Sequence, residues 1–148
     1  MKKRTILIGA TVFVLDRCGK LWAKAALPEQ GPFVALPKLL ELRYSENRGI
    51  ALGFLSGETA ATLLLPILAV IVWFYVFRKR QAAVLTVTAS AVMLAGFAGN
   101  ILDRLMYGYV VDMLYFPFLP WFICNIADIA ICVGVGMMGL NLLIRPQE

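Results

Sequence analysis

Long apolar stretches, interrupted by a few charged residues, dominate the chain. Two of them, residues 59–77 and 81–102, carry no charge, and each is long enough for a transmembrane helix, which needs about 20 residues. Two more, residues 5–25 and 120–144, are apolar apart from a few charged positions. The pattern therefore predicts four transmembrane helices over about residues 5–25, 59–77, 81–102 and 120–144.

The segments between the predicted helices have a different pattern. Apolar and polar residues alternate over residues 40–45, which is the two-residue period of a half-buried strand, and Gly49, Gly53 and Gly57 follow. This predicts a small antiparallel sheet on the membrane surface, which needs packing against the helices to be stable. Residues 107–121 are rich in aromatic residues and proline, and we expect them to form a surface loop at the level of the lipid headgroups.

Composition agrees with a membrane protein of one domain. Hydrophobic residues make up 61% of the 148 residues and charged residues 16%, whereas soluble domains are about 45–50% apolar. The segments outside the helices are too short to bury a separate soluble core. We therefore expect an all-α integral membrane protein in which residues 1–148 form a single membrane-embedded domain, with a small extracytoplasmic β-sheet and a surface loop.

Basic residues are distributed unevenly between the two sides of the predicted helices, in a chain of net charge +5. The positive-inside rule places the richer side, which includes both termini and a turn at residues 78–80, in the cytoplasm. Because the basic residues gather at helix ends and not along one face, a nucleic-acid partner is not expected. The inner set is Lys2, Lys3, Arg4, Arg78, Lys79, Arg80 and Arg145, and the outer set is Lys38, Arg43, Arg48 and Arg104.

The first predicted helix begins like a secretory signal peptide, with basic residues followed by an apolar run. Signal cleavage requires small neutral residues beside the cut, however, and Asp16 and Arg17 occupy those places. We therefore expect this helix to be retained.

The residue types present limit the chemistry. The chain has no histidine, which excludes Ser/His/Asp and Cys/His catalysis and histidine metal ligands. Cys18, Cys124 and Cys132 lack the spacing of a metal site or a redox pair and are interpreted as small packing residues. Neither a metal ion nor another cofactor is expected.

Charged residues inside the predicted helices lie toward the outer side. Each costs about 2.5–3.5 kcal/mol at the bilayer centre on insertion scales, so each needs a partner or a function. At 1.5 Å per residue, Asp16 lies about 18 Å and Lys20 about 24 Å along a helix that starts near Arg4. Asp128 lies about 12 Å below the outer end of a helix that starts near Pro120. We expect the same region to receive Asn47, Asn100, Asp103, Arg104 and Asp112.

Several motifs together resemble one family over nearly the whole chain. They are Asp16 with Lys20, residues 47–54 (NRGIALGF), 99–104 (GNILDR), 110–112 (VVD) and 125–128 (NIAD). In this order and spacing they resemble lipoprotein signal peptidase, also called signal peptidase II, an aspartic peptidase family. Arg17, Leu52, residues 95–98, Met113 and Cys124 depart from the family pattern. We expect these departures to affect packing and the shape of the substrate pocket, and not the carboxylates.

The resemblance implies a multi-pass enzyme of the bacterial inner membrane that cleaves a prolipoprotein just before its diacylglyceryl-modified cysteine, close to the extracytoplasmic face. It also implies that Asp112 and Asp128 are the catalytic pair. Independently, peptide hydrolysis without a nucleophilic side chain or a metal needs a water between two carboxyl groups, one ionised and one protonated. Two close carboxyls in an apolar site share a proton in this way. Membrane lipids and lipid-modified prolipoproteins are the expected partners, and the chain is expected to act as a monomer.

The other polar residues have two possible interpretations, as substrate-binding groups or as structural support. Asp16 and Lys20, one helical turn apart, are expected to form an ion pair that braces the site, although Lys20 is also long enough to reach the headgroups. Asp103 and Arg104 are interpreted most simply as a local ion pair at a helix end; alternatively, Arg104 and Asn100 hold the substrate backbone or orient the aspartates. Asn47 and Asn125 are either turn formers or amides that bind a peptide backbone, and Gly49 is expected to permit a tight turn.

Two other functional classes remain as alternatives. A small transporter or proton channel would use Asp16, Lys20 and Asp128 as a relay, but it needs polar residues through the depth of the membrane, and the inner halves of the last three predicted helices carry no charge. A non-catalytic scaffold would not need two acidic residues placed on the outer side next to asparagines.

Overall fold

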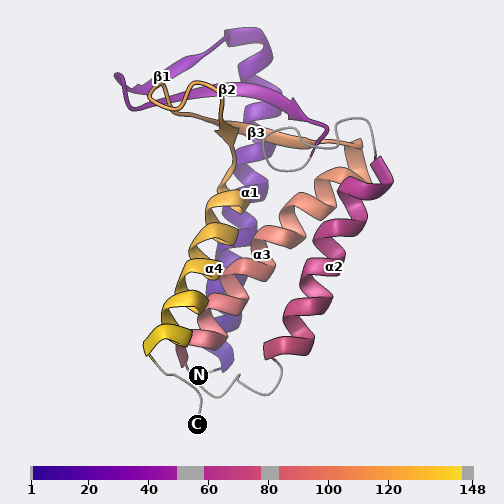
Figure 1. The fold of residues 1–148 in the computed structure, drawn as a ribbon. Coiled ribbons are helices and arrows are strands. Elements are labelled where there is room, and N and C mark those ends of the chain that lie inside the picture. Colours follow the sequence, from indigo (N-terminus) through magenta and orange to yellow (C-terminus); the bar gives the residue numbers. More distant parts are fainter. Residues whose placement is uncertain (1, 50–58, 78–83, 145–148) are drawn as a thin grey trace.

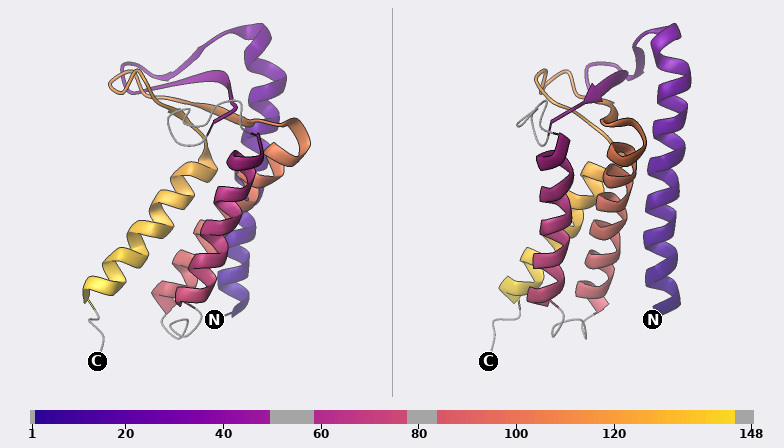
Figure 2. Two further views of the ribbon diagram at one scale, coloured as in Figure 1. Left: turned by 45° about the vertical axis from the view of Figure 1, so that its right-hand side comes forward. Right: turned by 90° about the vertical axis from the view of Figure 1, so that its right-hand side faces the viewer.

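The computed structural model describes residues 2–49, 59–77 and 84–144. In these residues the elements follow the order α1 (Lys2–Gln30), β1 (Phe33–Leu36), β2 (Leu40–Asn47), α2 (Thr59–Phe77), α3 (Val84–Tyr107), β3 (Val110–Tyr115), β4 (Ile123–Cys124) and α4 (Ile126–Ile144). The helices form a bundle, and the sheet lies across one end of it (Figure 1). The start of α1 and the end of α4 lie at the opposite end (Figure 2).

The helices agree with the predicted ones in number and order, but their ends differ. Helix α1 continues to Gln30 and stops where Gly31 adopts a φ of 76° and donates its N–H to the carbonyl of Leu27 at 2.9 Å, a left-handed helix stop that glycine favours. Helix α3 continues to Tyr107. Helix α4 begins at Ile126, so the predicted start near Pro120 is wrong, and Asp128 lies in the first turn of the helix and not about two turns from its start.

The apolar helices differ in how well each satisfies a membrane-span criterion. Among the described residues, α3 is the one helix long and apolar enough to cross a membrane by length and composition. Two shorter apolar stretches, Ala61–Tyr75 in α2 and Ile126–Asn141 in α4, accompany it. The molecule is thus mostly helical with a small antiparallel sheet.

The predicted sheet is present but larger than expected. Its order is β1-β2-β3-β4 and all neighbours are antiparallel, with Ser45 of β2 opposite Asp112 of β3. Strands β3 and β4 come from residues 107–121 and just beyond, so the prediction of a surface loop there is wrong over Val110–Tyr115. The first four residues of β3 are all buried, which removes the alternation by which strands are recognised.

Helix α3 packs closely against α1 and α4 near the end of the bundle that carries the sheet. Helix α3 contacts each of the other three helices. A Cβ atom at Gly96 would collide with the backbone of Ala127 in α4, and one at Gly99 would collide with the carboxylate of Asp16 in α1. These glycines therefore let α4 and the Asp16 side chain approach the backbone of α3. The sheet in turn packs on the C-terminal part of α1 through a core of Ala23, Leu27, Val111 and Met113.

Several sequence-based predictions lie outside the described residues. They concern the basic residues at positions 78–80 and 145, Gly53 and Gly57, and positions 50–54 of the family motif. The single domain, the membrane orientation and the monomeric state stay predictions.

Candidate active site

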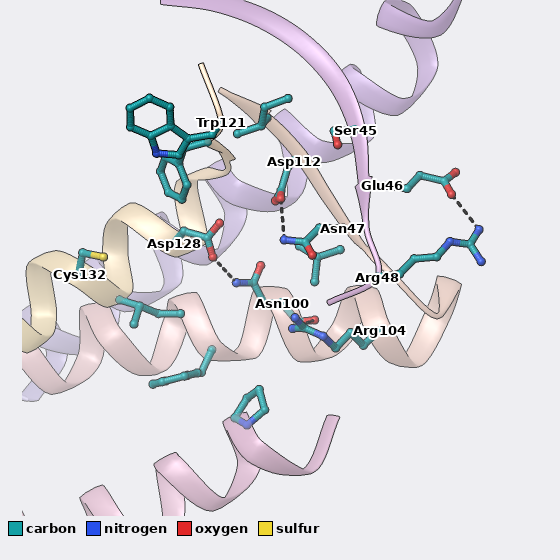
Figure 3. Close-up of a pocket in the computed structure, with 16 residues that line it drawn as sticks. Ser45, Glu46, Asn47, Arg48, Asn100, Arg104, Asp112, Trp121, Asp128 and Cys132 are labelled. Carbon is teal, nitrogen blue, oxygen red and sulfur yellow. Dashed lines mark hydrogen bonds and ion pairs between the residues drawn. The ribbon is translucent and has the colours of Figure 1, made fainter. Parts of the chain in front are cut away.

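Asp112 and Asp128 both open onto one cavity at the junction of the sheet and the helices (Figure 3). We call them the cavity aspartates. The cavity has a volume of about 570 Å³. Its polar wall includes Asn47, Asn100, Arg104 and the cavity aspartates, and its apolar wall includes Pro66 of α2, Phe97 of α3, Ile131 of α4 and Trp121. An acidic pair thus faces a space that is otherwise largely apolar.

Asp112 is held by two amides and almost completely removed from solvent. Its side chain is 2% exposed. Asn47 of β2 donates to one carboxylate oxygen at 3.0 Å, and Asn125 donates to the other at 2.6 Å. Burial and, to a lesser extent, the negative charge of Asp128 together raise the pKa of Asp112 to about 7, against the opposing effect of the two amides. Asp112 therefore holds a proton readily near neutral pH.

Asp128 belongs to a reciprocal cap at the start of α4. The Asn125 side chain accepts the backbone N–H of Asp128 at 2.9 Å, and the Asp128 carboxylate accepts the backbone N–H of Asn125 at 3.2 Å. This is a capping box, with the acid on the third residue of the helix, where the helix dipole favours a negative charge. Asn100 of α3 donates to the other oxygen of Asp128 at 2.7 Å. Asn125 therefore contacts both cavity aspartates.

Behind the cavity lies a buried group of charged side chains, the α1–α3 charge cluster, formed by Asp16, Arg17, Lys20 and Asp103. Lys20 lies 3.0 Å from the Asp16 carboxylate and 3.1 Å from that of Asp103. It also donates to the side-chain oxygen of Asn100 at 2.8 Å, and Asn100 contacts Asp128. The side-chain amide of Asn100 thus links the charge cluster to the cavity aspartate Asp128.

The two acids of the charge cluster also fix the backbone beside the cavity aspartates. Asp16 accepts the N–H of Ala127 at 2.9 Å, and Asp103 accepts the N–H of Val111 at 3.1 Å. Each of these N–H groups belongs to the residue directly before a cavity aspartate. Asp16 of α1 and Asp103 of α3 therefore help to set the position of both acids through the backbone.

Asp103 and Arg104 do not form the predicted local ion pair. Asp103 pairs instead with Lys20 and Arg17 of α1. Arg104 donates to the backbone carbonyl of Gly49 at 2.9 Å. Neighbouring residues on a helix point to different faces, which explains the separation. The Gly49 N–H donates to the Asn47 side chain at 3.0 Å, so Asn47 forms a turn and also contacts Asp112.

Sequence reasoning missed two features of the site. Arg17 departs from the family pattern, and this departure was expected to affect packing and not the carboxylates. Its guanidinium nevertheless pairs with the carboxylate of Asp103, 86 residues away in sequence. In addition, Cys132, which is exposed, lines the cavity, whereas Cys124 is buried. The sequence did contain a signal for the Arg17 contact, because Arg17 adds a charge directly beside Asp16, which is buried. Within the described part of the chain, no cluster of histidine, cysteine and acidic residues could hold a metal ion.

The fold is shared with bacterial membrane enzymes. Two solved structures, described as bacterial membrane enzymes determined by the in meso method at 2.3 Å and 1.9 Å, match with TM-scores of 0.87 and 0.83. Their sequence identities are 27% and 28%, and the matches cover 99% and 95% of this chain and 94% and 93% of theirs.

The family follows from sequence comparison. The family model described as signal peptidase (SPase) II matches residues 8–144, and the chain belongs to this family. Lipoprotein signal peptidases of Clostridium acetobutylicum, Caldanaerobacter subterraneus subsp. tengcongensis and Chlorobaculum tepidum are 32%, 34% and 37% identical. These matches cover 97%, 95% and 90% of this chain and 96%, 96% and 90% of the relatives.

Proposed function

We propose that this protein is an aspartic endopeptidase that removes the signal peptide from diacylglyceryl-modified bacterial prolipoproteins, with Asp112 and Asp128 as the catalytic pair. The family supplies the activity. The observation that carries the choice of residues is the single cavity onto which both carboxyls open, with Asn125 bonded to each.

The different surroundings of the two acids suggest a division of work. Asp128 is the acid of the capping box and accepts hydrogen bonds from Asn125 and Asn100, which stabilise its ionised form. Asp112, whose pKa burial raises to about 7, carries the proton. One ionised and one protonated carboxyl is the arrangement that aspartic hydrolysis requires.

The reaction then proceeds through a water held between the two acids. Asp128 takes a proton from the water while the water oxygen attacks the scissile carbonyl carbon. Asp112 gives its proton to the carbonyl oxygen. The tetrahedral intermediate collapses when Asp128 returns the proton to the leaving amine, the C–N bond breaks, and Asp112 recovers its proton from the oxygen. Asn47, Asn100 and Asn125 keep the acids oriented throughout this exchange.

The remaining polar residues prepare the substrate site. Arg104 ties the end of β2 to α3 through the carbonyl of Gly49, which defines one edge of the cavity. The apolar wall formed by Pro66, Phe97 and Ile131 suits the apolar part of a signal peptide. The charge cluster supports the cavity aspartates from behind.

We place all four helices across the bacterial inner membrane, with both termini in the cytoplasm and the sheet at the outer surface. The helices carry exposed apolar side chains that suit lipid contact, such as Leu7 and Val14 of α1, Leu68 of α2 and Leu143 of α4. The cavity then lies near the outer leaflet, at the depth of a lipid-anchored substrate. We take residues 1–148 as one domain that acts as a monomer.

The test uses purified enzyme and a prolipoprotein segment prepared with and without the diacylglyceryl group. We expect cleavage only of the modified form, because the lipid fixes the scissile bond at the depth of the cavity and contributes about 0.8 kcal/mol per buried methylene. Activity should persist in a chelator, since two carboxyls suffice. Equal cleavage of both forms would contradict the proposed substrate, and loss of activity on chelation would contradict the metal-free mechanism.

A further inference from the structure

Arg17 belongs to the charge cluster but touches neither cavity aspartate in the interactions that the structure describes. Its guanidinium pairs with one oxygen of Asp103, whose other oxygen accepts Lys20 at 3.1 Å and the N–H of Val111 at 3.1 Å. The side chain of Arg17 is 12% exposed and that of Asp103 is fully buried. The pair therefore sits where solvent screens charge weakly.

The charges of the cluster balance only when Arg17 is included. Asp16 and Asp103 contribute two negative charges, and Lys20 and Arg17 contribute two positive ones. Without Arg17, a buried carboxylate would remain unbalanced directly behind the strand that carries Asp112. An uncompensated buried charge acts on its neighbours through a low effective dielectric.

We propose that Arg17 is a positioning residue for the peptidase reaction: it pairs with Asp103 and keeps Asp103 directed at the Val111 N–H, and it makes the charge cluster neutral behind the cavity aspartates. The inference rests on the proposed function. It assigns Arg17 an electrostatic effect on the catalytic pair through Asp103, without contact with substrate.

The effect should appear in the pH profile of cleavage. A charge cluster with one extra negative charge favours protonation of the cavity aspartates, so both limbs of the profile move to higher pH. A cluster with one extra positive charge moves both limbs to lower pH. Lys20 and Arg104 also act on the pair from α1 and α3.

Other titratable and charged side chains also lie near the cavity and the charge cluster. Glu46 and Arg48 line it from the side of β2 and form an exposed ion pair with each other. Cys124 of β4 and Cys132 of α4 are the nearby thiols, and Tyr107 of α3 faces Arg17. None of these groups changes in the variants proposed below.

The experiment compares the pH profiles of wild type, Arg17→Gln, Asp103→Asn and the double variant, all purified and acting on lipid-modified substrate. We expect Arg17→Gln to shift both limbs upward by about half a unit to one unit, and Asp103→Asn to shift them downward by a similar amount. The double variant restores neutrality, so its profile should return toward that of wild type. Arg17→Lys should keep the wild-type profile.

Arg43→Gln is the matched control, because Arg43 also pairs with a carboxylate, that of Glu41, but does so on the sheet, where the two side chains are 39% and 20% exposed. Its profile should not move. An unshifted profile for Arg17→Gln, or shifts of the two single variants in the same direction, would overturn the proposal. If Arg17→Gln does not fold, Asp103→Asn decides alone, by a downward shift or by none. Failure of the wild type to cleave the substrate would instead overturn the proposed function.

Discussion

In the proposed mechanism, Asp112 and Asp128 have two different roles because their surroundings differ. Asp112 lies in a strand among buried apolar residues, with Val111 and Met113 on either side of it. Asp128 lies at a helix start, where backbone N–H groups favour an anion. In the proposed mechanism, backbone geometry and burial, and not residue identity, therefore decide which of the two acids carries the proton.

Replacing either cavity aspartate with asparagine is the direct test of the pair. Asparagine keeps the shape of the side chain and can still accept a hydrogen bond at the start of α4, but it cannot take up or release a proton. We expect each single variant to lose cleavage by several orders of magnitude, and the double variant to be little worse, because residues that act as one unit are strongly non-additive. The measurement is the initial rate on lipid-modified substrate. A folded Asp128→Asn variant that works at near the wild-type rate would exclude the mechanism.

The pH dependence of the same rate follows from the raised pKa of Asp112, about 7. The proposed acid must be protonated, so the rate should fall as the pH rises through and above about 7. At low pH the rate should fall again, because the ionised partner becomes protonated. The result is a bell-shaped profile whose two apparent constants belong to the pair. A rate that stays constant between pH 6 and pH 10 would contradict the assignment of the proton to Asp112.

At the level of helices and strands, the small residues between α3 and α4 form a tight contact that can be tested. A Cβ atom at Gly134 would lie 2.7 Å from the carbonyl oxygen of Ala89 and 2.6 Å from Cβ of Met93, whereas one at Gly136 would meet nothing within 4 Å. We expect Gly134→Val to separate the helices and to lower the free energy of unfolding by about 1–3 kcal/mol. Thermal unfolding in detergent measures this, with Gly136→Val as the control. Equal unfolding temperatures for the two variants would show that the contact is not tight.

The helices were easier to predict from sequence than the strands. Apolar length alone located α2 correctly, but the start of α4 depends on Asn125, and a single capping residue is a weaker signal than an apolar run that continues upstream to Pro120. Strand β3 was missed because burial on both faces makes it uniformly apolar around Asp112.

The candidate site was predictable as a set of residues but not as a set of contacts. Motif spacing pointed to the acids, asparagines and lysine that the structure brings together. It could not show that Asp103 bonds to the backbone of Val111 or that Arg17 pairs with Asp103, because these contacts depend on how α1, α3 and β3 pack.

At the scale of the whole molecule, the orientation in the membrane is a separate prediction. It rests on the excess of basic residues in the segments that the sequence predicts to face the cytoplasm. Fusing a reporter that is active only outside the cytoplasm after Gly108, between α3 and β3, should give a signal, and fusion after Lys79 should give none. The reverse pattern would place the cavity on the cytoplasmic side, where a lipoprotein precursor is not processed.

The backbone contacts of Asp16 and Asp103 have a consequence for the biogenesis of the enzyme. The cavity aspartates come from late segments of the chain, yet the acceptors that fix the residue before each of them lie in α1 and α3. A nascent chain whose α1 has not docked lacks one of these acceptors and the lysine beside it. In the proposed mechanism, proteolytic competence therefore depends on the docking of α1 against α3 and α4.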